Sequence, residues 1–267
     1  MYETMAISSF DSDVLSIDFG AKRKNLRILC IGDIHYGSEG CAEDEFYELI
    51  KWAHKEENLH VIGMGDYLDL ASKHSVGDVH NQKITPDEQI NWILDVFRPF
   101  RRRLIGLIAG NHEDRVVRET GIDIVKLVAD NLKCPYLGYG GFQSWKIGTQ
   151  NYSAYICHGS SGSSKTWTKL KSVIDMGAFC NVDLVASGHT HTLDTTTQRI
   201  FSVENGKLTE KVCTFVLTGS WLKWLNTYAQ KRNFAPARLG NPIIKLNGVH
   251  KEIEVDLNAH TGHKIYK

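Results

Sequence analysis

The sequence predicts an α/β fold in which two packed β-sheets carry helices on their outer faces. In residues 25–192, short apolar runs alternate with segments of helical periodicity. In residues 193–267, alternating strand patterns flank Asn-Gly pairs, which is typical of antiparallel hairpins rather than of a purely parallel sheet. A chain of 267 residues can bury a large core in one unit. We therefore expect a single domain over 1–267, with all the polar motifs described below in 25–192 and the second sheet completed by 193–267.

The amino-terminal half predicts strands and helices in alternation. The apolar run Ile28–Ile31 is short, β-branched and ended by Gly32, which indicates a buried strand. Residues 42–58 have apolar side chains at helical spacing with acidic residues first. Thr85–Glu88 is a capping box with proline at the first helical position. The other elements expected here are a loose start at 1–12, an edge strand at 13–19, strands at 59–64 and 104–109, a loop at Ala71–Ile84 and a helix at 121–132.

The carboxyl-terminal half predicts hairpins. Asn205-Gly206 and Asn247-Gly248 each stand between two alternating runs, which is a strong hairpin signal. Gly148 separates two further apolar runs that predict an antiparallel pair. The segments expected are strands at 142–147, 151–157, 182–187, 195–203, 207–219, 242–246 and 250–257, and a helix at 166–176.

Polar residues follow the carboxyl ends of five predicted strands. Asp33 and His35 come directly after the central strand, and residues two apart in extended chain point to the same side. Ligands of open α/β sheets bind at this end of the strands. Five such endings in one chain indicate a polynuclear metal site. The other four endings carry Asp66 and Asp69, Asn111 and His112, His158, and His189 and His191.

The chemistry of these side chains limits the metal. Carboxylate, amide and imidazole ligands suit borderline divalent ions such as manganese, iron or zinc. No cysteine belongs to the set, which argues against a structural zinc cage. Two neighbouring metal ions can clamp a phosphate group and supply a hydroxide for in-line attack.

In chain order the motifs are D-x-H, G-D-x-x-D, G-N-H-E, H-G and G-H-x-H, and they extend from Asp33 to His191. This series resembles the calcineurin-like metallophosphoesterase superfamily. The resemblance implies a four-layer β-sandwich, with two mixed sheets flanked by helices. It also implies a hydrolase that uses two divalent metal ions and a bridging hydroxide on a phosphate ester. We expect Mn²⁺, with Fe or Zn as the alternatives.

The resemblance further implies a role for each motif residue. Asp66 would bridge both metal ions, His112 would protonate the leaving oxygen, and Asp69 would accept a hydrogen bond from the other nitrogen of His112. The implied ligands are Asp33, His35 and His191 for the first metal ion, and Asn111, His158 and His189 for the second.

The departures from the family pattern bear on the substrate. The Ser/Thr protein phosphatases of the family have G-D-x-x-D-R-G, with another arginine before G-N-H-E. This chain has Leu70 and Ala71 after Asp69, and Ala109 before Gly110. Those arginines grip a dianionic monoester, so their loss favours a phosphodiester substrate. The remaining candidates for substrate contact are Arg115, Arg118 and Lys165.

Three functions stay open at this stage. We expect a phosphodiesterase that acts on nucleic acid or on nucleotides. The first alternative is a phosphomonoesterase that acts on a phosphoprotein or a small metabolite. The second is a metal-binding scaffold without catalysis, but scaffolds of this kind lose ligands or the acid, and this chain retains them all.

Composition limits the partners. The chain has 31 basic and 31 acidic residues, which argues against binding a polyanion through bulk charge but leaves a local basic groove open. Trp221–Arg238 interleaves aromatic residues with cations. Such a stretch can clamp single-stranded nucleic acid, pack as an amphipathic helix or contact a second subunit.

The cysteines and the hydropathy of the sequence predict the cellular location of the protein. The six cysteines form no C-x-x-C pair, so we expect reduced thiols. No apolar run is long enough to span a bilayer, and no signal peptide opens the sequence. We expect a cytoplasmic protein with no membrane partner.

Overall fold

The computed structural model describes residues 5–11, 13–71, 82–225, 227–231 and 233–258. The chain forms two β-sheets. The larger sheet consists of β1 (Ala6–Asp11), β2 (Val14–Asp18), β6 (Gly140–Ile147), β7 (Gln150–Cys157), β8 (Leu184–Ser187), β9 (Leu193–Glu204) and β10 (Lys207–Thr218). The smaller sheet consists of β3 (Asn25–Ile31), β4 (Leu59–Gly63), β5 (Leu104–Leu107), β11 (Ile243–Asn247) and β12 (Ile253–Asp256).

Both sheets are mixed. The larger sheet has the order β1-β2-β6-β7-β8-β10-β9, and the smaller has the order β12-β11-β3-β4-β5. β7, β8 and β10 run parallel, as do β3, β4 and β5, whereas the hairpins add antiparallel pairs. The helices are α1 (Glu43–Lys55), α2 (Pro86–Phe97), α3 (Asn111–Thr120), α4 (Ile124–Leu132), α5 (Thr166–Phe179) and α6 (Tyr228–Lys231), with a 3₁₀ turn η2 at Arg98–Phe100.

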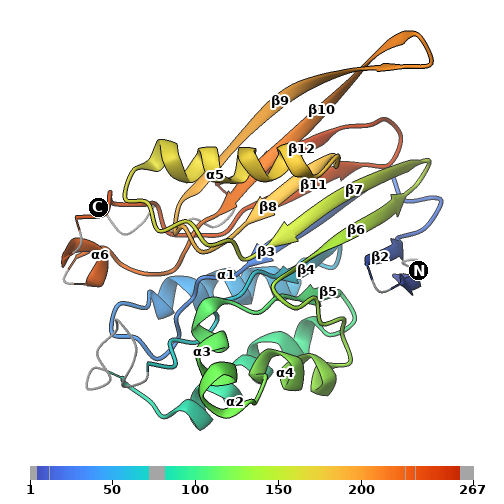
Figure 1. Ribbon diagram of the computed structural model, residues 1–267. Helices are drawn as coiled ribbons and strands as arrows, with labels where there is room; N and C mark the ends of the chain where they lie inside the picture. The colour runs from blue at the N-terminus through green and yellow to red at the C-terminus, as the bar shows by residue number, and fades with distance from the viewer. Residues whose placement is uncertain (1–4, 12, 72–81, 226, 232, 259–267) are drawn as a thin grey trace.

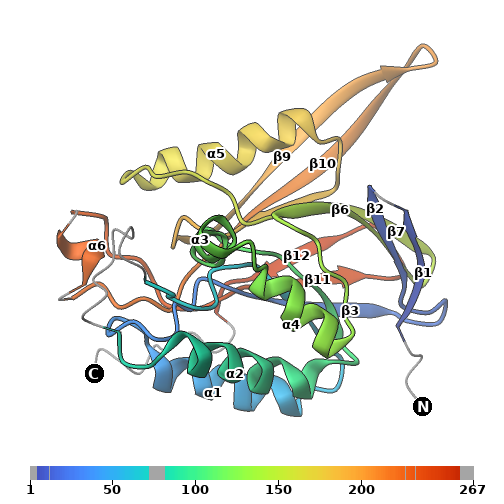
Figure 2. The same cartoon turned by 60° about the horizontal axis from the view of Figure 1, so that its bottom comes forward.

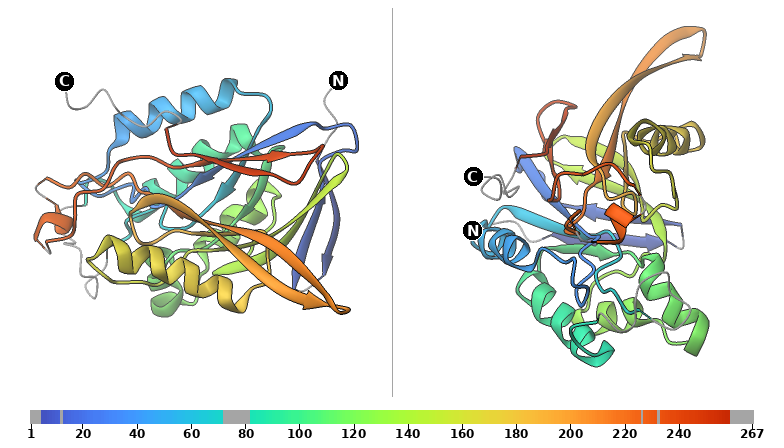
Figure 3. Two further views of the ribbon diagram at one scale, coloured as in Figure 1. Left: turned by 90° about the horizontal axis from the view of Figure 1, so that it is seen from above. Right: turned by 90° about the vertical axis from the view of Figure 1, so that its left-hand side faces the viewer.

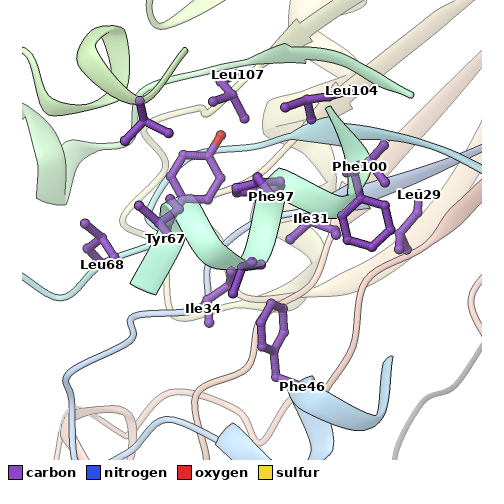
Figure 4. Close-up of a cluster of buried hydrophobic side chains, with 14 of the residues drawn as sticks. Leu29, Ile31, Ile34, Phe46, Tyr67, Leu68, Phe97, Phe100, Leu104 and Leu107 are labelled. Atoms are coloured by element: carbon purple, nitrogen blue, oxygen red, sulfur yellow. The ribbon is translucent and has the colours of Figure 1, made fainter. Parts of the chain in front are cut away.

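The elements stack in four layers, and this confirms the expected fold class. α1, α2 and α4 lie on the outer face of the smaller sheet, and α5 lies on the outer face of the larger sheet (Figure 1). The two sheets pack face to face through Ile28, Ile62, Trp145 and Val216, all fully buried. A second core joins the helices to the smaller sheet through Phe46 and other residues, among them Leu29, Ile31, Tyr67, Phe97 and Phe100 (Figure 4).

The capping box and the Asn205-Gly206 hairpin are confirmed. The second expected hairpin is also present as the antiparallel pair of β11 and β12, but residues 248–252 connect its strands rather than a two-residue turn. Thr85 caps α2 by accepting from the Glu88 N–H at 3.3 Å, while the Glu88 carboxylate accepts from the Thr85 N–H at 2.8 Å. Asn205 and Gly206 have φ values of 51° and 72°, which a tight hairpin turn requires. β9 and β10 form a long ribbon that projects from the body of the protein (Figures 1 and 3).

Three expectations about elements are wrong. Residues 13–19 are not the edge of their sheet. β1 forms the edge instead and pairs with β2, in a segment where we expected a loose start (Figure 2). α3 begins directly at the G-N-H-E motif and was not expected, since its sequence has few apolar residues. Trp221–Arg238 is not a helix, because only Tyr228–Lys231 is helical in its described part.

Two expectations stay predictions. Most of the Ala71–Ile84 loop, residues 72–81, lies outside the described residues. Contact with a second subunit through Trp221–Arg238 is also untested. Within the described chain, no helix has the length and hydrophobicity to cross a membrane.

Candidate metal centre

The predicted site residues lie at the seam between the two sheets. Asp33, Asp66 and Asn111 follow β3, β4 and β5 of the smaller sheet, and His158 and His189 follow β7 and β8 of the larger sheet. The cluster therefore needs both sheets in register, and neither sheet alone supplies it.

Two motif glycines allow these strand ends to approach each other. A Cβ on Gly110 would lie 2.1 Å from Oδ1 of Asp66, and a Cβ on Gly188 would lie 2.8 Å from Oδ2 of Asp33. Any side chain at these positions would push a carboxylate out of the cluster. Steric crowding at the strand ends therefore explains why glycine precedes Asn111 and His189.

The backbone at the site is left-handed rather than extended. Asp33 has φ 49° and His35 has φ 53°, so the extended geometry that we expected for this pair is wrong. Asp66, His189 and His191 also have positive φ, between 48° and 66°. Such conformations cost of order 1–3 kcal/mol each for residues other than glycine, and they concentrate at functional sites.

One group of side chains joins Asp33, His35, Asp66 and His191. Their potential ligand atoms all lie within 4.8 Å of one another. Nε2 of His35 and Nε2 of His191 are 3.0 Å apart, and Nε2 of His191 is 3.3 Å from Oδ1 of Asp33. Three of the four residues are buried. Buried nitrogen and oxygen atoms that converge without apolar filling suit a divalent cation.

The second group shares Asp66 with the first. It joins Asp66, His158 and His189 within the same 4.8 Å limit. Nε2 of His158 lies 3.2 Å from Oδ2 of Asp66 and 3.2 Å from Oδ1 of Asn111. Nδ1 of His189 is buried and has no hydrogen-bond partner among the described residues, so it is available as a ligand atom. The shared carboxylate makes the cluster fit a binuclear metal site.

Carbonyl groups fix the tautomers of two histidines. Nδ1 of His158 lies 2.8 Å from the Met64 carbonyl oxygen, and Nδ1 of His112 lies 2.7 Å from the Asp69 carbonyl oxygen. Because a carbonyl only accepts, each Nδ1 carries the proton and donates it. Nε2 of His158 is then left to bind a metal ion, and Nε2 of His112 is left to face the cluster.

Asp69 accepts a hydrogen bond from Nδ1 of His112, as expected, but through its main chain rather than its carboxylate. The main-chain oxygen of Asp69 accepts the hydrogen bond, whereas its carboxylate oxygen Oδ1 is 3.5 Å from Nδ1 of His112. The Asp69 carboxylate instead accepts from the Gln82 side chain. A main-chain acceptor holds His112 whatever side chain stands at position 69.

Titratable side chains crowd around Asp66 and shift one another's pKa values. Burial alone would raise the pKa of Asp66, but His158 and His112 hold that pKa well below its usual range. Burial disfavours the charged form of His158, yet Asp66 raises the pKa of His158 to about 10. Burial and the charges of His112 and His191 lower the pKa of His35. Asp66 is therefore the anionic centre of the cluster.

Glu113 is a functional residue that the sequence reasoning missed. It is buried, and its carboxylate accepts the main-chain N–H groups of Asp66, Tyr67, Leu68 and Gly110 at 2.8–3.1 Å. Burial and the Asp66 carboxylate raise the pKa of Glu113 to about 7. The glutamate was visible as the last letter of G-N-H-E, but only the structure shows that it ties the loop of Asp66 to the start of α3.

The carboxyl-terminal part also supports the site. The Ser220 hydroxyl and the Trp221 N–H both donate to the Asp33 carbonyl oxygen, at 2.9 Å. Trp221 is fully buried and donates from Nε1 to Asn241, while Trp224 donates to the Phe234 carbonyl. Trp221 is thus occupied by the fold, and the expectation that it could stack on nucleic acid is wrong.

The candidate substrate cations lie around the cluster rather than in it. Arg118 pairs with Asp114 at 2.9 Å and is 67% exposed, Arg115 is half-buried on α3, and Lys165 is exposed at the N-cap of α5. One turn after Lys165, the buried Lys169 donates to the Thr190 carbonyl at 2.6 Å, between His189 and His191. The sequence did not single out Lys169, because a lysine on a helix is usually solvated.

Comparison with known proteins agrees with this arrangement. Residues 26–193 match the family model described as calcineurin-like phosphoesterase. No curated protein matches the chain.

Solved structures with a similar fold include three of low identity. Vps29 of Entamoeba histolytica in complex with Zn²⁺ is 14% identical, with 86% of this chain and 97% of that chain covered and a TM-score of 0.39. GAP50 of Plasmodium is 12% identical, with 88% and 86% covered and a TM-score of 0.47. A protein of Streptococcus pneumoniae described as a predicted phosphoesterase is 11% identical, with 86% and 88% covered and a TM-score of 0.38.

Replacing the shared carboxylate is expected to weaken both metal positions. In Asp66→Ala, metal content measured by elemental analysis after loading with Mn²⁺ should fall from two ions per chain toward zero, because one oxygen donor serves both groups. The exposed Asp95→Ala serves as the control and should keep the full content. One ion retained at full occupancy in Asp66→Ala would contradict the bridging role.

Removing the Glu113 carboxylate is expected to destabilise the loop of Asp66. Glu113→Ala leaves four buried N–H groups without an acceptor, at about 1–3 kcal/mol each where water cannot reach them. We expect a loss of at least about 3 kcal/mol in denaturant unfolding and weaker metal binding. Glu113→Gln, which keeps one oxygen, should fall between, and the exposed Glu48→Ala should match wild type. A Glu113→Ala protein as stable as wild type would show that Glu113 does not hold the loop of Asp66 in place.

Proposed function

Because the chain belongs to the calcineurin-like phosphoesterase family, we propose that it hydrolyses phosphodiesters of nucleic acid or nucleotides with two divalent metal ions. The observation that carries this proposal is the carboxylate of Asp66, shared by two groups of buried ligand atoms with His112 beside them. Asp33, His35 and His191 would hold one ion, and Asn111, His158 and His189 the other. When bound, such a pair supplies Lewis acidity to water and phosphate. We propose Mn²⁺ as the native metal.

His112 has the geometry of a proton donor. Its main-chain N–H donates to Oδ1 of Asp66 at 2.9 Å, and its Nδ1–H donates to the Asp69 carbonyl. These two contacts leave Nε2 facing the cluster, 3.9 Å from Oδ2 of Asp66. A histidine held in this way can carry a proton on Nε2 to the leaving oxygen.

A diester is favoured over a monoester by the side chains around the cluster. Leu70 and Ala109 are buried apolar residues where the resemblance would place phosphate-gripping arginines. The guanidinium of Arg118 already forms an ion pair with the Asp114 carboxylate. A dianionic monoester gains most from bidentate cationic contacts, whereas a diester carries a single negative charge.

A phosphomonoesterase is the second candidate. The buried ammonium of Lys169, next to the main chain between His189 and His191, favours it because it places a positive charge beside the cluster.

We also propose the cytoplasm as the location, since all six cysteines are free thiols and burial raises the pKa of Cys30 to about 12.

A paired assay tests the reaction and the substrate class. Metal-stripped protein reloaded with Mn²⁺ should hydrolyse bis-4-nitrophenyl phosphate with a higher kcat/KM than 4-nitrophenyl phosphate, and it should cleave single-stranded DNA. A preference for the monoester would support the second candidate instead. No turnover with Mn²⁺, Fe²⁺ or Zn²⁺ would contradict the proposed enzymatic activity and favour a metal-binding scaffold.

Loss of the proposed acid should separate turnover from metal binding. His112→Ala is expected to lower kcat for the preferred ester by roughly 10²–10⁴-fold while keeping two metal ions per chain. The exposed His54→Ala is the matched control and should leave kcat unchanged. If His112→Ala loses metal, then His112 is a ligand and the assignment of the acid is wrong.

A further inference from the structure

A cavity of about 350 Å³ opens beside the second group of ligand atoms. Its lining combines Asn111 and His158 with Asp114 and with the aromatic and sulfur side chains of Tyr139, Tyr155, Cys157 and Met176. Its volume is at the small end of the range for pockets that bind small molecules, roughly 300–1,000 Å³. An occupant of this cavity would be in contact with residues of the candidate metal centre.

The aromatic and sulfur side chains of the lining are held in place by contacts near His158. Tyr139 precedes β6, and its carbonyl accepts the main-chain N–H of His158 at 3.1 Å. Tyr155 lies two residues before Cys157 on β7 and packs against Phe142, with ring centroids 4.8 Å apart. Sγ of Cys157 lies 3.5 Å from Sδ of Met176, which joins β7 to α5. The wall is therefore aromatic and thioether surface fixed relative to the cluster.

The charges of the cavity lining disfavour a second phosphate group as the occupant. No lysine or arginine is among the described residues that line it. Asp114 pairs with Arg118 and accepts from the Tyr139 hydroxyl, and a carboxylate has about four acceptor positions. A second phosphate group would meet the Asp114 carboxylate, and the Arg118 guanidinium beside that carboxylate is already paired with it. A neutral group with N–H donors would instead find an unused acceptor.

Tyr139 is an exposed residue of the cavity lining. The residue is 59% exposed. An exposed ring that is tethered through its hydroxyl to Asp114 offers a flat face to a ligand. Planar heterocycles stack on such faces in proteins that bind single-stranded nucleic acid.

We infer that this cavity binds one unpaired nucleobase of the substrate. The inference rests on the proposed function, because the cavity begins at Asn111 and His158, where the phosphate would lie. A base combines a flat face for Tyr139 with N–H donors for Asp114, and it carries no charge. The volume accommodates a single base, so a base within a duplex would first have to leave its stack. The substrates are then single-stranded nucleic acid or small nucleotides.

A matched pair of ligands tests the inference without turnover. Adenosine 5′-monophosphate and ribose 5-phosphate share the phosphate and the sugar and differ only in the base. In calorimetric titrations of the full chain without added metal, the nucleotide should bind roughly ten-fold more tightly than ribose 5-phosphate. Equal affinities, or no measurable binding of the nucleotide, would overturn the inference.

Variants at the wall locate the effect. Tyr139→Ala should reduce the ratio of the two affinities to about one, whereas Tyr139→Phe, which keeps the ring, should retain most of it. Tyr47→Ala, at an exposed tyrosine on α1, is the matched control and should keep the wild-type ratio. An unchanged ratio in Tyr139→Ala would show that the base binds elsewhere.

The outcome is separable from that of the proposed function. Hydrolysis of bis-4-nitrophenyl phosphate by the Mn²⁺-loaded protein, with equal affinities for the two ligands, would refute the base site and leave the phosphodiesterase in place. A ten-fold ratio without hydrolysis by any metal-loaded form would support the base site and refute the proposed reaction.

Discussion

The carboxylate of Glu113 holds the candidate site together. Four main-chain N–H groups from two different loops converge on it inside the protein, where each would be costly without an acceptor. This contact fixes the loop of Asp66 against the first turn of α3, which carries Asn111 and His112. Asp66 can then keep a left-handed backbone and present its two oxygens to opposite sides: Oδ1 to the His112 N–H, and Oδ2 to the histidines.

The position of the cluster follows from the sandwich. The smaller sheet supplies two carboxylates, an amide and His35, and the larger sheet supplies His158, His189 and His191. Since the ligand atoms come from both sheets, metal ions bound here would stabilise the packing of one sheet against the other. The segment around Trp221 adds a third support, because it donates two hydrogen bonds to the Asp33 carbonyl.

The surroundings of the cluster divide by charge. Lys169 lies near His189 and His191, whereas the cavity beyond Asn111 and His158 is aromatic with one carboxylate. A phosphate at the cluster would thus lie between a cation and a cavity that is lined by aromatic side chains and one carboxylate. This asymmetry suits an ester whose organic group has a defined direction, and it connects the proposed diester chemistry with a base in the cavity.

The sequence by itself determined the layered fold, the two Asn-Gly hairpins, the capping box of α2 and the family. These depend on local periodicity and on motif order, which are readable along the chain. Only the tertiary structure revealed the contacts of Glu113, Lys169 and Tyr139, because their partners lie far from them in the sequence or on other elements. It also placed β1 at the sheet edge and Trp221 in the core. Finally, it replaced the extended geometry of Asp33 and His35 with left-handed backbone, which local propensity disfavours and only surrounding contacts can impose.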